Sequence, residues 1–206
     1  RGEIGSYLGT QGAALTCRLQ KIAVEESRLG IPLLFGYDVI HGHRTVFPVP
    51  LAESSSFDPE EVQHAARVAA VEAAAHGIHW TYAPMVDIAR DPRWGRIVEG
   101  AGEDPYLGSV LAAARVRGFQ GDDLRKPDAV LATAKHFVAY GAAEAGRDYN
   151  VADISERTLH EVYLPPFKAA IDAGAQSIMA SFNEIAGVPM HAHRPLIQDL
   201  LRKEWG

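Results

Sequence analysis

The chain has 206 residues, of which 47% are hydrophobic and 22% charged, enough for one sizeable folded domain. Its 20 basic and 26 acidic residues give a net charge of −6, and no basic run favours binding to nucleic acid or a membrane surface. No apolar stretch approaches the roughly 20 residues needed to cross a bilayer. The single cysteine, Cys17, excludes a disulfide within these residues and leaves the cellular compartment open.

The beginning of the chain predicts two strands with a helix between them. Residues 4–8 are a short strand candidate, and residues 12–28 have the apolar spacing of a helix that Gly30 can end. Residues 32–38 follow as an apolar strand whose last residue is an acid, Asp38. The apolar face of the helix is expected to consist of Leu15, Leu19, Ile22 and Leu29.

The next helix carries both a start and a stop signal. Asp58 is placed to cap it, Pro59 occupies the first helical position, and Glu61 is expected to complete a capping box. An alanine-rich pattern then runs to His76. There Gly77 can take the left-handed conformation that ends a helix.

The remaining elements continue the alternation. Residues 78–86 predict a third strand, and a long arginine-rich loop follows it. Asp104 begins a helix that runs to about residue 119, residues 130–137 form the fourth strand, and a polar loop extends to Asn150.

A helix capped within residues 153–156 comes next, and Pro165 and Pro166 must bend or interrupt it because neither can donate a hydrogen bond in the helical ladder. Residues 176–182 form the fifth strand, and residues 195–205 a last helix.

This order predicts an α/β fold in which parallel strands are joined by helical crossovers, as an open doubly wound sheet or a (β/α) barrel. No glycine-rich phosphate loop follows a strand, which disfavours the nucleotide-binding sheet. Polar residues gather instead after successive strands, as they do in barrel enzymes. We therefore predict a partial (β/α)8 barrel of the TIM type, with about five βα units and an unpaired edge at the fifth strand.

Two polar residues, Lys135 and His136, stand at the end of the fourth strand. Parallel α/β folds place their chemistry there, and burying such side chains without partners is costly. If the strand has already ended, both side chains lie in solvent instead. Neighbours on a strand normally point to opposite faces, so a shared site requires unusual geometry, and a cis peptide bond between them is one solution.

Other polar clusters follow the second and third strands. Asp38 can accept two hydroxyl hydrogen bonds, which suits a sugar, or it can cap the next turn and pair with Arg44. The segment 90–96, RDPRWGR, is the most specific in the chain. For Arg90 and Arg93 the expected role is an internal ion network rather than ligand binding. The carboxylates available to it are Glu99, Glu103 and Asp104.

Four segments together resemble the N-terminal barrel of glycoside hydrolase family 3, with the bacterial β-glucosidase branch as the nearest likeness. They cover essentially the whole chain in order. The branch that releases N-acetylglucosamine with a His–Asp dyad differs after its KHF motif, where this chain reads GAAEAGRDYN. The four segments are GYDVIHG at 36–42, DPRWGR at 91–96, KHF at 135–137 and SIMASFNEIAGVP at 177–189.

The resemblance implies a sugar-binding role for five polar residues. Asp38, with Arg44 beside it, would hold the outer hydroxyls of the non-reducing sugar. Arg96, Lys135 and His136 would bind the remaining ring hydroxyls.

Two apolar residues, Met179 and Phe182, would line the same subsite, although either can also be ordinary core. Many family members have Tyr at the position of Phe182, where it is hydrogen-bonded to the nucleophile.

The same resemblance places no catalytic residue in this chain. The family's nucleophile is an Asp in a motif like GFxGFVVSDW, which would begin at Trp205-Gly206, and the acid/base normally comes from a later domain. Retaining hydrolysis needs both carboxylates. We therefore expect residues 1–206 to be the incomplete N-terminal catalytic barrel of a longer multidomain glycosidase, and to be inactive alone.

The expected function is the sugar-binding part of a retaining β-glucosidase that hydrolyses terminal non-reducing β-D-glucosyl residues. Its expected partners are a β-glucoside or oligosaccharide substrate and the remaining C-terminal domains of the enzyme. No cofactor, metal, nucleic acid or membrane is expected.

Two alternatives remain open. The H-x-H spacing of His41 and His43, repeated at His191 and His193, suggests a metal-dependent amidohydrolase-like barrel with Lys135 as a further ligand. The other alternative is a non-catalytic sugar-binding module.

Overall fold

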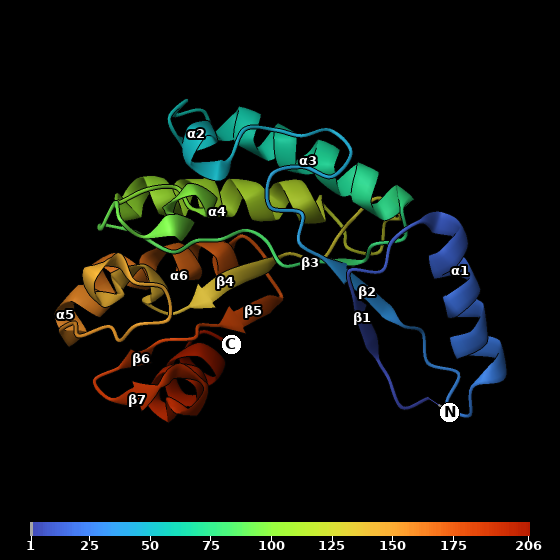
Figure 1. The fold of residues 1–206 in the computed structure, drawn as a ribbon. Helices are drawn as coiled ribbons and strands as arrows, with labels where there is room; N and C mark the ends of the chain where they lie inside the picture. Colours follow the sequence, from blue (N-terminus) through green and yellow to red (C-terminus); the bar gives the residue numbers. More distant parts are fainter. Residues whose placement is uncertain (1) are drawn as a thin grey trace.

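The computed structural model describes residues 2–206 and contains five parallel strands that pair in chain order. The first three form one sheet, and the last two pair with each other. Figure 1 shows them as an open arc, so the predicted α/β fold with an unclosed barrel is confirmed. The strands are β1 (Ser6–Leu8), β2 (Leu34–Tyr37), β3 (Trp80–Thr81), β4 (Thr133–Phe137) and β5 (Ser177–Ala180).

Irregular pairing joins β3 to β4. Single parallel bridges connect Trp80 to Leu131 and Met85 to Lys135, so the third strand continues past the end of β3. The predicted third strand is thus present but regular at only two residues. Pro84 lies within it and has no N–H to donate to a ladder.

Helices of three kinds connect and cover the strands. The α-helices are α1 (Ala13–Lys21), α2 (Pro50–Ser54), α3 (Pro59–Ala75), α4 (Pro105–Gln120), α5 (Glu156–Thr158) and α6 (Pro165–Asp172). Short 3-10 turns are η2 (Gly95–Glu99), η3 (Tyr140–Ala142), η4 (Glu144–Gly146) and η6 (Met190–Ala192). The π-helical segments are η1 (Ile22–Glu26), η5 (Leu159–Tyr163) and η7 (Pro195–Glu204).

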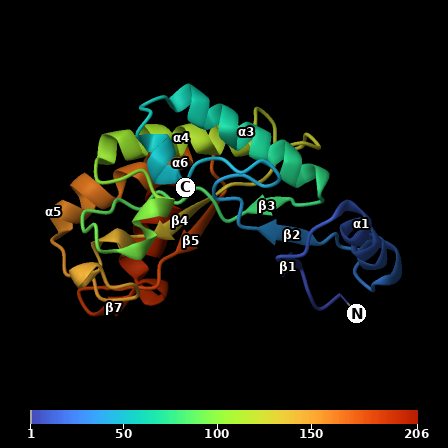
Figure 2. The same cartoon turned by 45° about the horizontal axis from the view of Figure 1, so that its top comes forward.

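Helix α4 packs between α3 and α6 on the outside of the arc, while α1 lies at the β1–β2 end (Figures 1 and 2). The contact between α3 and α4 depends on small residues. Ala66 and Ala70 of α3 are buried, and a Cβ on Gly118 of α4 would lie 2.5 Å from the Gln63 carbonyl oxygen and 2.6 Å from Ala66 Cβ. The main core therefore lies between these helices and the strands.

The cap of α3 is only partly as predicted. Asp58 Oδ1 accepts hydrogen bonds from the backbone N–H groups of Glu60 and Glu61, at 3.1 and 3.2 Å. The expected capping box is wrong, because the Asp58 N–H donates to Ser56 Oγ at 3.1 Å rather than to the Glu61 side chain. Gly77 ends the helix with a φ of 77°, as expected.

The predicted apolar face of the first helix is also corrected. Leu15, Ile22 and Leu29 are exposed, whereas Thr16 and Ala23 are buried. Leu19 is partly buried against Leu33 and Phe35, as expected. From residue 22 the helix continues as the π-helix η1, so the α-helical spacing used for the prediction no longer applies there, and Leu29 lies beyond the end of η1.

The end of the chain also adds detail to the prediction. The predicted helix break is present, because η5 ends before a new helix, α6, begins at Pro165. A short antiparallel hairpin that the sequence did not indicate follows β5; its strands are β6 (Glu184–Ile185) and β7 (Val188–Pro189). Across residues 2–206, no helix has the length and apolar composition needed to cross a bilayer.

Candidate functional site

An ion pair joins the carboxyl ends of two strands. Lys135 Nζ on β4 lies 2.7 Å from Oδ2 of Asp38, which directly follows β2. The lysine side chain is 3% exposed and the aspartate 46%, so the buried cation meets a carboxylate that still faces solvent. Close packing of β2 supports this position: a Cβ on Gly36 would lie 2.1 Å from the hydroxyl oxygen of Tyr82. Burial raises the pKa of that tyrosine, and the Asp38 carboxylate raises it further.

A second acid holds the next residue of β4. Asp87 Oδ2 accepts one hydrogen bond from the backbone N–H of His136 and is paired with the imidazole Nδ1, both at 2.9 Å. Both side chains are buried, at 3% exposure for the histidine and 1% for the aspartate. The peptide bond between Lys135 and His136 is cis, as predicted. Asp87 directly follows the predicted third strand, residues 78–86, and that position was the signal by which the sequence could have indicated it.

Arg96 forms the third charged group, through a two-point ion pair with Glu99. The distances are 2.7 Å from Nε to Oε1 and 3.0 Å from Nη2 to Oε2. Burial alone would raise the pKa of Glu99, but the ion pair with Arg96, helped by the charge of Lys135, lowers it. The arginine also lies 5.6 Å from the ring centre of Tyr140, whose ring is 5.2 Å from that of His136. One aromatic ring thus links Arg96 to His136.

Trp94 holds the arginine-rich loop in place through contacts with the loop that follows β4. Trp94 is buried, donates from Nε1 to Asp148 Oδ1 at 2.9 Å, and packs edge-on against Tyr140. This contact holds the loop after the third strand against the loop after β4. The sequence did not indicate it, because the two hydrogen-bonded residues are 54 positions apart.

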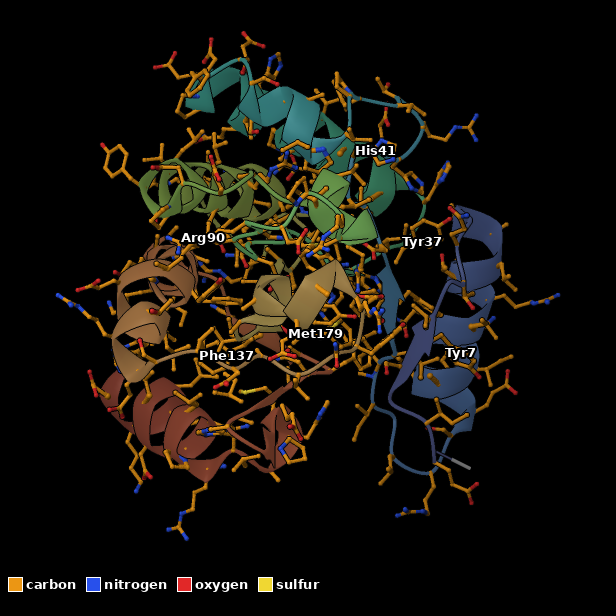
Figure 3. All side chains as sticks on the ribbon, turned by 60° about the vertical axis from the view of Figure 1, so that its left-hand side comes forward. Tyr7, Tyr37, His41, Arg90, Phe137 and Met179 are labelled. Atoms are coloured by element: carbon orange, nitrogen blue, oxygen red, sulfur yellow. The ribbon has the colours of Figure 1, made fainter. Side chains whose placement is uncertain are left out.

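The expected ion network around this loop is only partly correct. Glu99 takes part, but its partner is Arg96, which had been expected to bind ligand. Arg93 pairs with its neighbour Asp91 at 2.6 Å and lowers that carboxyl's pKa to about 2. Arg90 lies instead on the α4 and η5 side of the molecule (Figure 3), near enough to Tyr163 to oppose the rise that burial causes in that tyrosine's pKa. Asp104 caps α4.

Two apolar residues, Met179 and Phe182, lie beside the polar groups. Met179 pairs in register with Lys135 and lies toward the middle of the molecule (Figure 3). Phe182, 54% exposed, has its ring centre 6.4 Å from that of His136 and 5.2 Å from that of Tyr149. The polar residues therefore have an exposed aromatic wall on one side.

The structure does not bring Arg44 into this group. Glu72 of α3 accepts hydrogen bonds from the backbone N–H groups of Arg44 and Thr45, both at 2.8 Å, and this holds the loop against the helix. The arginine side chain is exposed, and its guanidinium forms no ion pair within the described part of the chain. The structure thus shows Arg44 without a side-chain bond to Asp38 or Lys135, and its place in the sugar site stays a prediction.

The ligand set of the metal alternative is also separated. His41 Nδ1 is bonded to the Phe47 carbonyl oxygen at 3.0 Å, and His43 Nε2 to His76 Nδ1 at 2.7 Å, while Lys135 is held by Asp38. In residues 2–206 no group of three or more His, Cys, Asp or Glu side chains is arranged to hold a metal ion.

The assembled site presents hydrogen-bonding groups of both kinds. Lysine and arginine supply donors, the half-exposed carboxylate of Asp38 supplies acceptors, and an imidazole nitrogen can serve in either role. Together with an aromatic wall, this combination suits a ligand with several hydroxyl groups and an apolar ring face.

Known proteins match almost the whole of this chain. The family model described as Glycosyl hydrolase family 3 N terminal domain matches residues 4–206. A periplasmic β-glucosidase of Salmonella typhimurium is 44% identical over 205 residues, which are 100% of this chain and 27% of that protein. A β-xylosidase of Formosa agariphila is 41% identical over 197 residues, which are 89% of this chain and 27% of that protein.

Solved structures agree with these sequence relatives. The crystal structure of a β-glucosidase from Listeria innocua in complex with glucose superposes with a TM-score of 0.95 and 47% identity, over 99% of this chain and 29% of that one. The chain thus spans a little over a quarter of the length of these relatives.

Proposed function

Because the chain belongs to glycosyl hydrolase family 3, we propose that it forms the sugar-binding part of a retaining β-glucosidase. The substrate class is a β-glucoside or oligosaccharide whose terminal non-reducing β-D-glucosyl residue is hydrolysed. The observation that carries the proposal is the ion pair between Lys135 and Asp38, with His136 next to it at the strand ends.

Each polar group has a defined task in this proposal. Asp38 accepts hydrogen bonds from outer hydroxyls of the sugar, because its carboxylate is half exposed while its ion pair keeps it in place. Lys135 donates to ring hydroxyls beside it. Arg96 and His136 bind hydroxyls further along the ring, and Phe182 with Met179 borders the apolar face.

Hydrolysis itself requires a nucleophile and an acid/base that this assignment does not place in residues 1–206. Asp38 is bound to Lys135, Asp87 to His136 and Glu99 to Arg96, so each of these carboxylates already has a cationic or imidazole partner. We therefore assign the activity to a longer polypeptide that carries this chain, in line with the length of its relatives.

The test uses that natural polypeptide with 4-nitrophenyl β-D-glucoside and 4-nitrophenyl β-D-xyloside, with and without EDTA. Release of the β-anomer of glucose, followed by NMR, with a higher kcat/KM for the glucoside and no loss in EDTA, is the expected result. Hydrolysis that EDTA abolishes would favour the amidohydrolase-like alternative. Glucose binding by calorimetry without any hydrolysis would favour a sugar-binding module.

A further inference from the structure

We infer that Asp87 is a positioning residue that holds His136 with the proton on Nδ1, so that the neutral ring offers Nε2 as a hydrogen-bond acceptor for one substrate hydroxyl. The inference deepens the proposed function and rests on it for the identity of the substrate. It assigns a role to a buried acid that the sugar-binding residues named above do not include.

One oxygen atom of Asp87 fixes the orientation of the His136 ring through two hydrogen bonds. Oδ2 of Asp87 bonds both the backbone N–H and Nδ1 of His136, each at 2.9 Å, and this ties the side-chain rotation to the main chain. Tyr140 meets the imidazole edge-on at an interplanar angle of 73°, and the ring of Phe182 is tilted by 35° with its centre 6.4 Å from that of the imidazole. The ring therefore has contacts on its Nδ1 edge and from two aromatic residues.

The chemistry of the pair selects the tautomer. An ionised carboxylate only accepts hydrogen bonds, so the nitrogen that faces Asp87 must carry the proton. In a neutral imidazole the other nitrogen is then the acceptor. Nε2 of His136 makes no hydrogen bond inside residues 2–206. It is also accessible to solvent, whereas Oδ1 of Asp87 is both unbonded and fully buried. It is therefore the atom left for a ligand.

This role differs from simple support of the backbone. If Asp87 only satisfied the His136 N–H, its loss would lower stability and affect all substrates alike. If it sets the tautomer, its loss lets the proton move to Nε2 and turns the acceptor into a donor. Only the hydroxyl that faces Nε2 would then lose its partner.

The first measurement needs no variant. The natural polypeptide is labelled with 15N only at histidine, and a long-range 1H–15N spectrum is recorded at pH 8, with His136→Gln to assign the signal. Protonated Nδ1 and unprotonated Nε2 in the assigned ring are expected. An Nε2–H tautomer in the wild-type protein would overturn the inference whether or not the enzyme acts on glucosides.

The second measurement is a kinetic cycle with the 2-, 3-, 4- and 6-deoxy forms of an aryl β-glucoside. Asp87→Ala is expected to lower kcat/KM for the parent glucoside about tenfold or more. The loss should be much smaller for the one deoxy form that lacks the hydroxyl donating to Nε2. An equal loss on all five substrates would mean support of the backbone only and would overturn the inference.

Two further variants separate positioning from stability. Asp87→Asn can keep both bonds, because its amide oxygen can occupy the place of Oδ2 while the NH₂ occupies the place of the unpartnered Oδ1. It should retain the wild-type tautomer and most of kcat/KM, even if the Ala variant does not fold. Val116→Ala, a core change in α4, provides the control for lost stability and should leave the pattern across deoxy sugars unchanged. A changed pattern in Val116→Ala, or an Asn variant with the Nε2–H tautomer and unaltered kinetics, would count against the assignment.

Discussion

At the scale of single residues, the Asp38–Lys135 ion pair is asymmetric in its burial. The lysine is almost wholly enclosed, and within residues 2–206 it forms its ion pair with Asp38. The aspartate keeps about half of its surface and can bind a ligand without releasing the lysine. One carboxylate can therefore stabilise the fold and bind substrate at the same time.

Removing that carboxylate should affect both properties. In the longer polypeptide, Asp38→Ala is expected to lower kcat/KM for an aryl β-glucoside about 10- to 150-fold, the equivalent of the 1.5 to 3 kcal/mol of a charge-assisted hydrogen bond. It should also lower Tm, because Lys135 is left buried and unpaired. Steady-state kinetics and thermal melts check the two effects, with the exposed Asp172→Ala as control. An unchanged kcat/KM would dismiss the role proposed for Asp38.

The Arg96–Glu99 ion pair makes a prediction about pH. The pKa of Glu99 is lowered in the folded protein, so its contribution to stability is present above its ordinary pKa of 4.5 and is lost as pH falls through the folded value. Glu99→Gln should reduce stability by about 1 kcal/mol at pH 7, as expected for a single ion pair. The difference in Tm from wild type should shrink below pH 4.5. A difference that is constant from pH 7 to pH 3 would contradict this assignment.

At the scale of elements, two histidines join the loop after β2 to the end of α3. His43 and His76 share a hydrogen bond of 2.7 Å, next to the carboxylate of Glu72 that holds the same loop. Burial lowers the pKa of His43, and the neighbouring His76 lowers it further. The neutral ring is therefore the form that the fold accommodates.

This contact should weaken in mild acid. Because the folded pKa of His43 lies below 6.5, the unfolded chain takes up more protons there, and stability falls as pH drops from about 6.5 toward the folded value. Melts of wild type and His43→Gln between pH 7.5 and pH 5 should show a smaller pH dependence in the variant. His160→Gln, an exposed histidine on η5, is the matched control and should behave like wild type.

The elements also show what the sequence could predict. Helices α3 and α4 begin at the expected acids and prolines, because capping and a regular period are local signals. The short β3 was not predictable in this way, since irregular pairing with a later strand determines it. Nor did any local signal show that the first helix would continue as the π-helix η1.

The same division holds for the site. Strand-end position was enough to find Asp38 and Lys135, which meet across 97 positions of sequence. It also included Arg44, whose backbone N–H is bonded to Glu72 and whose side chain is exposed without an ion pair in the described part of the chain. The contact of His136 with Asp87 was not predicted, because the sequence around a residue does not show which acid at the end of another strand its side chain will contact.

At the scale of the whole molecule, the arc of strands is open at β1 and at β5, so both outer strands carry unpaired backbone edges within residues 2–206. Large apolar side chains are exposed near the β1 end. If residues 1–206 are produced alone, we expect them to associate, and light scattering with size-exclusion chromatography measures this. A stable monomer would contradict the expectation. The exposed residues are Ile4, Leu8, Ile31 and Leu34.

Residues 1–206 alone should also fail to hydrolyse an aryl β-glucoside. The oxocarbenium-like transition state needs a carboxylate below the ring and a proton donor at the leaving oxygen, and hydrogen bonds to hydroxyls supply neither. Release of nitrophenol from 4-nitrophenyl β-D-glucoside, measured beside the longer polypeptide, decides this. Turnover above background that Asp38→Asn removes would mean that Asp38 is itself catalytic.

The order of the strands has a consequence for synthesis on the ribosome. Each strand pairs with the one made just before it, through β3 and its extension to β4 and then β5. A newly emerging strand therefore finds its partner already outside the exit tunnel, and the arc can grow from the N-terminus as translation proceeds. Polypeptide stalled after β2 should already protect part of that pairing from proteases, before the residues of the site have been translated.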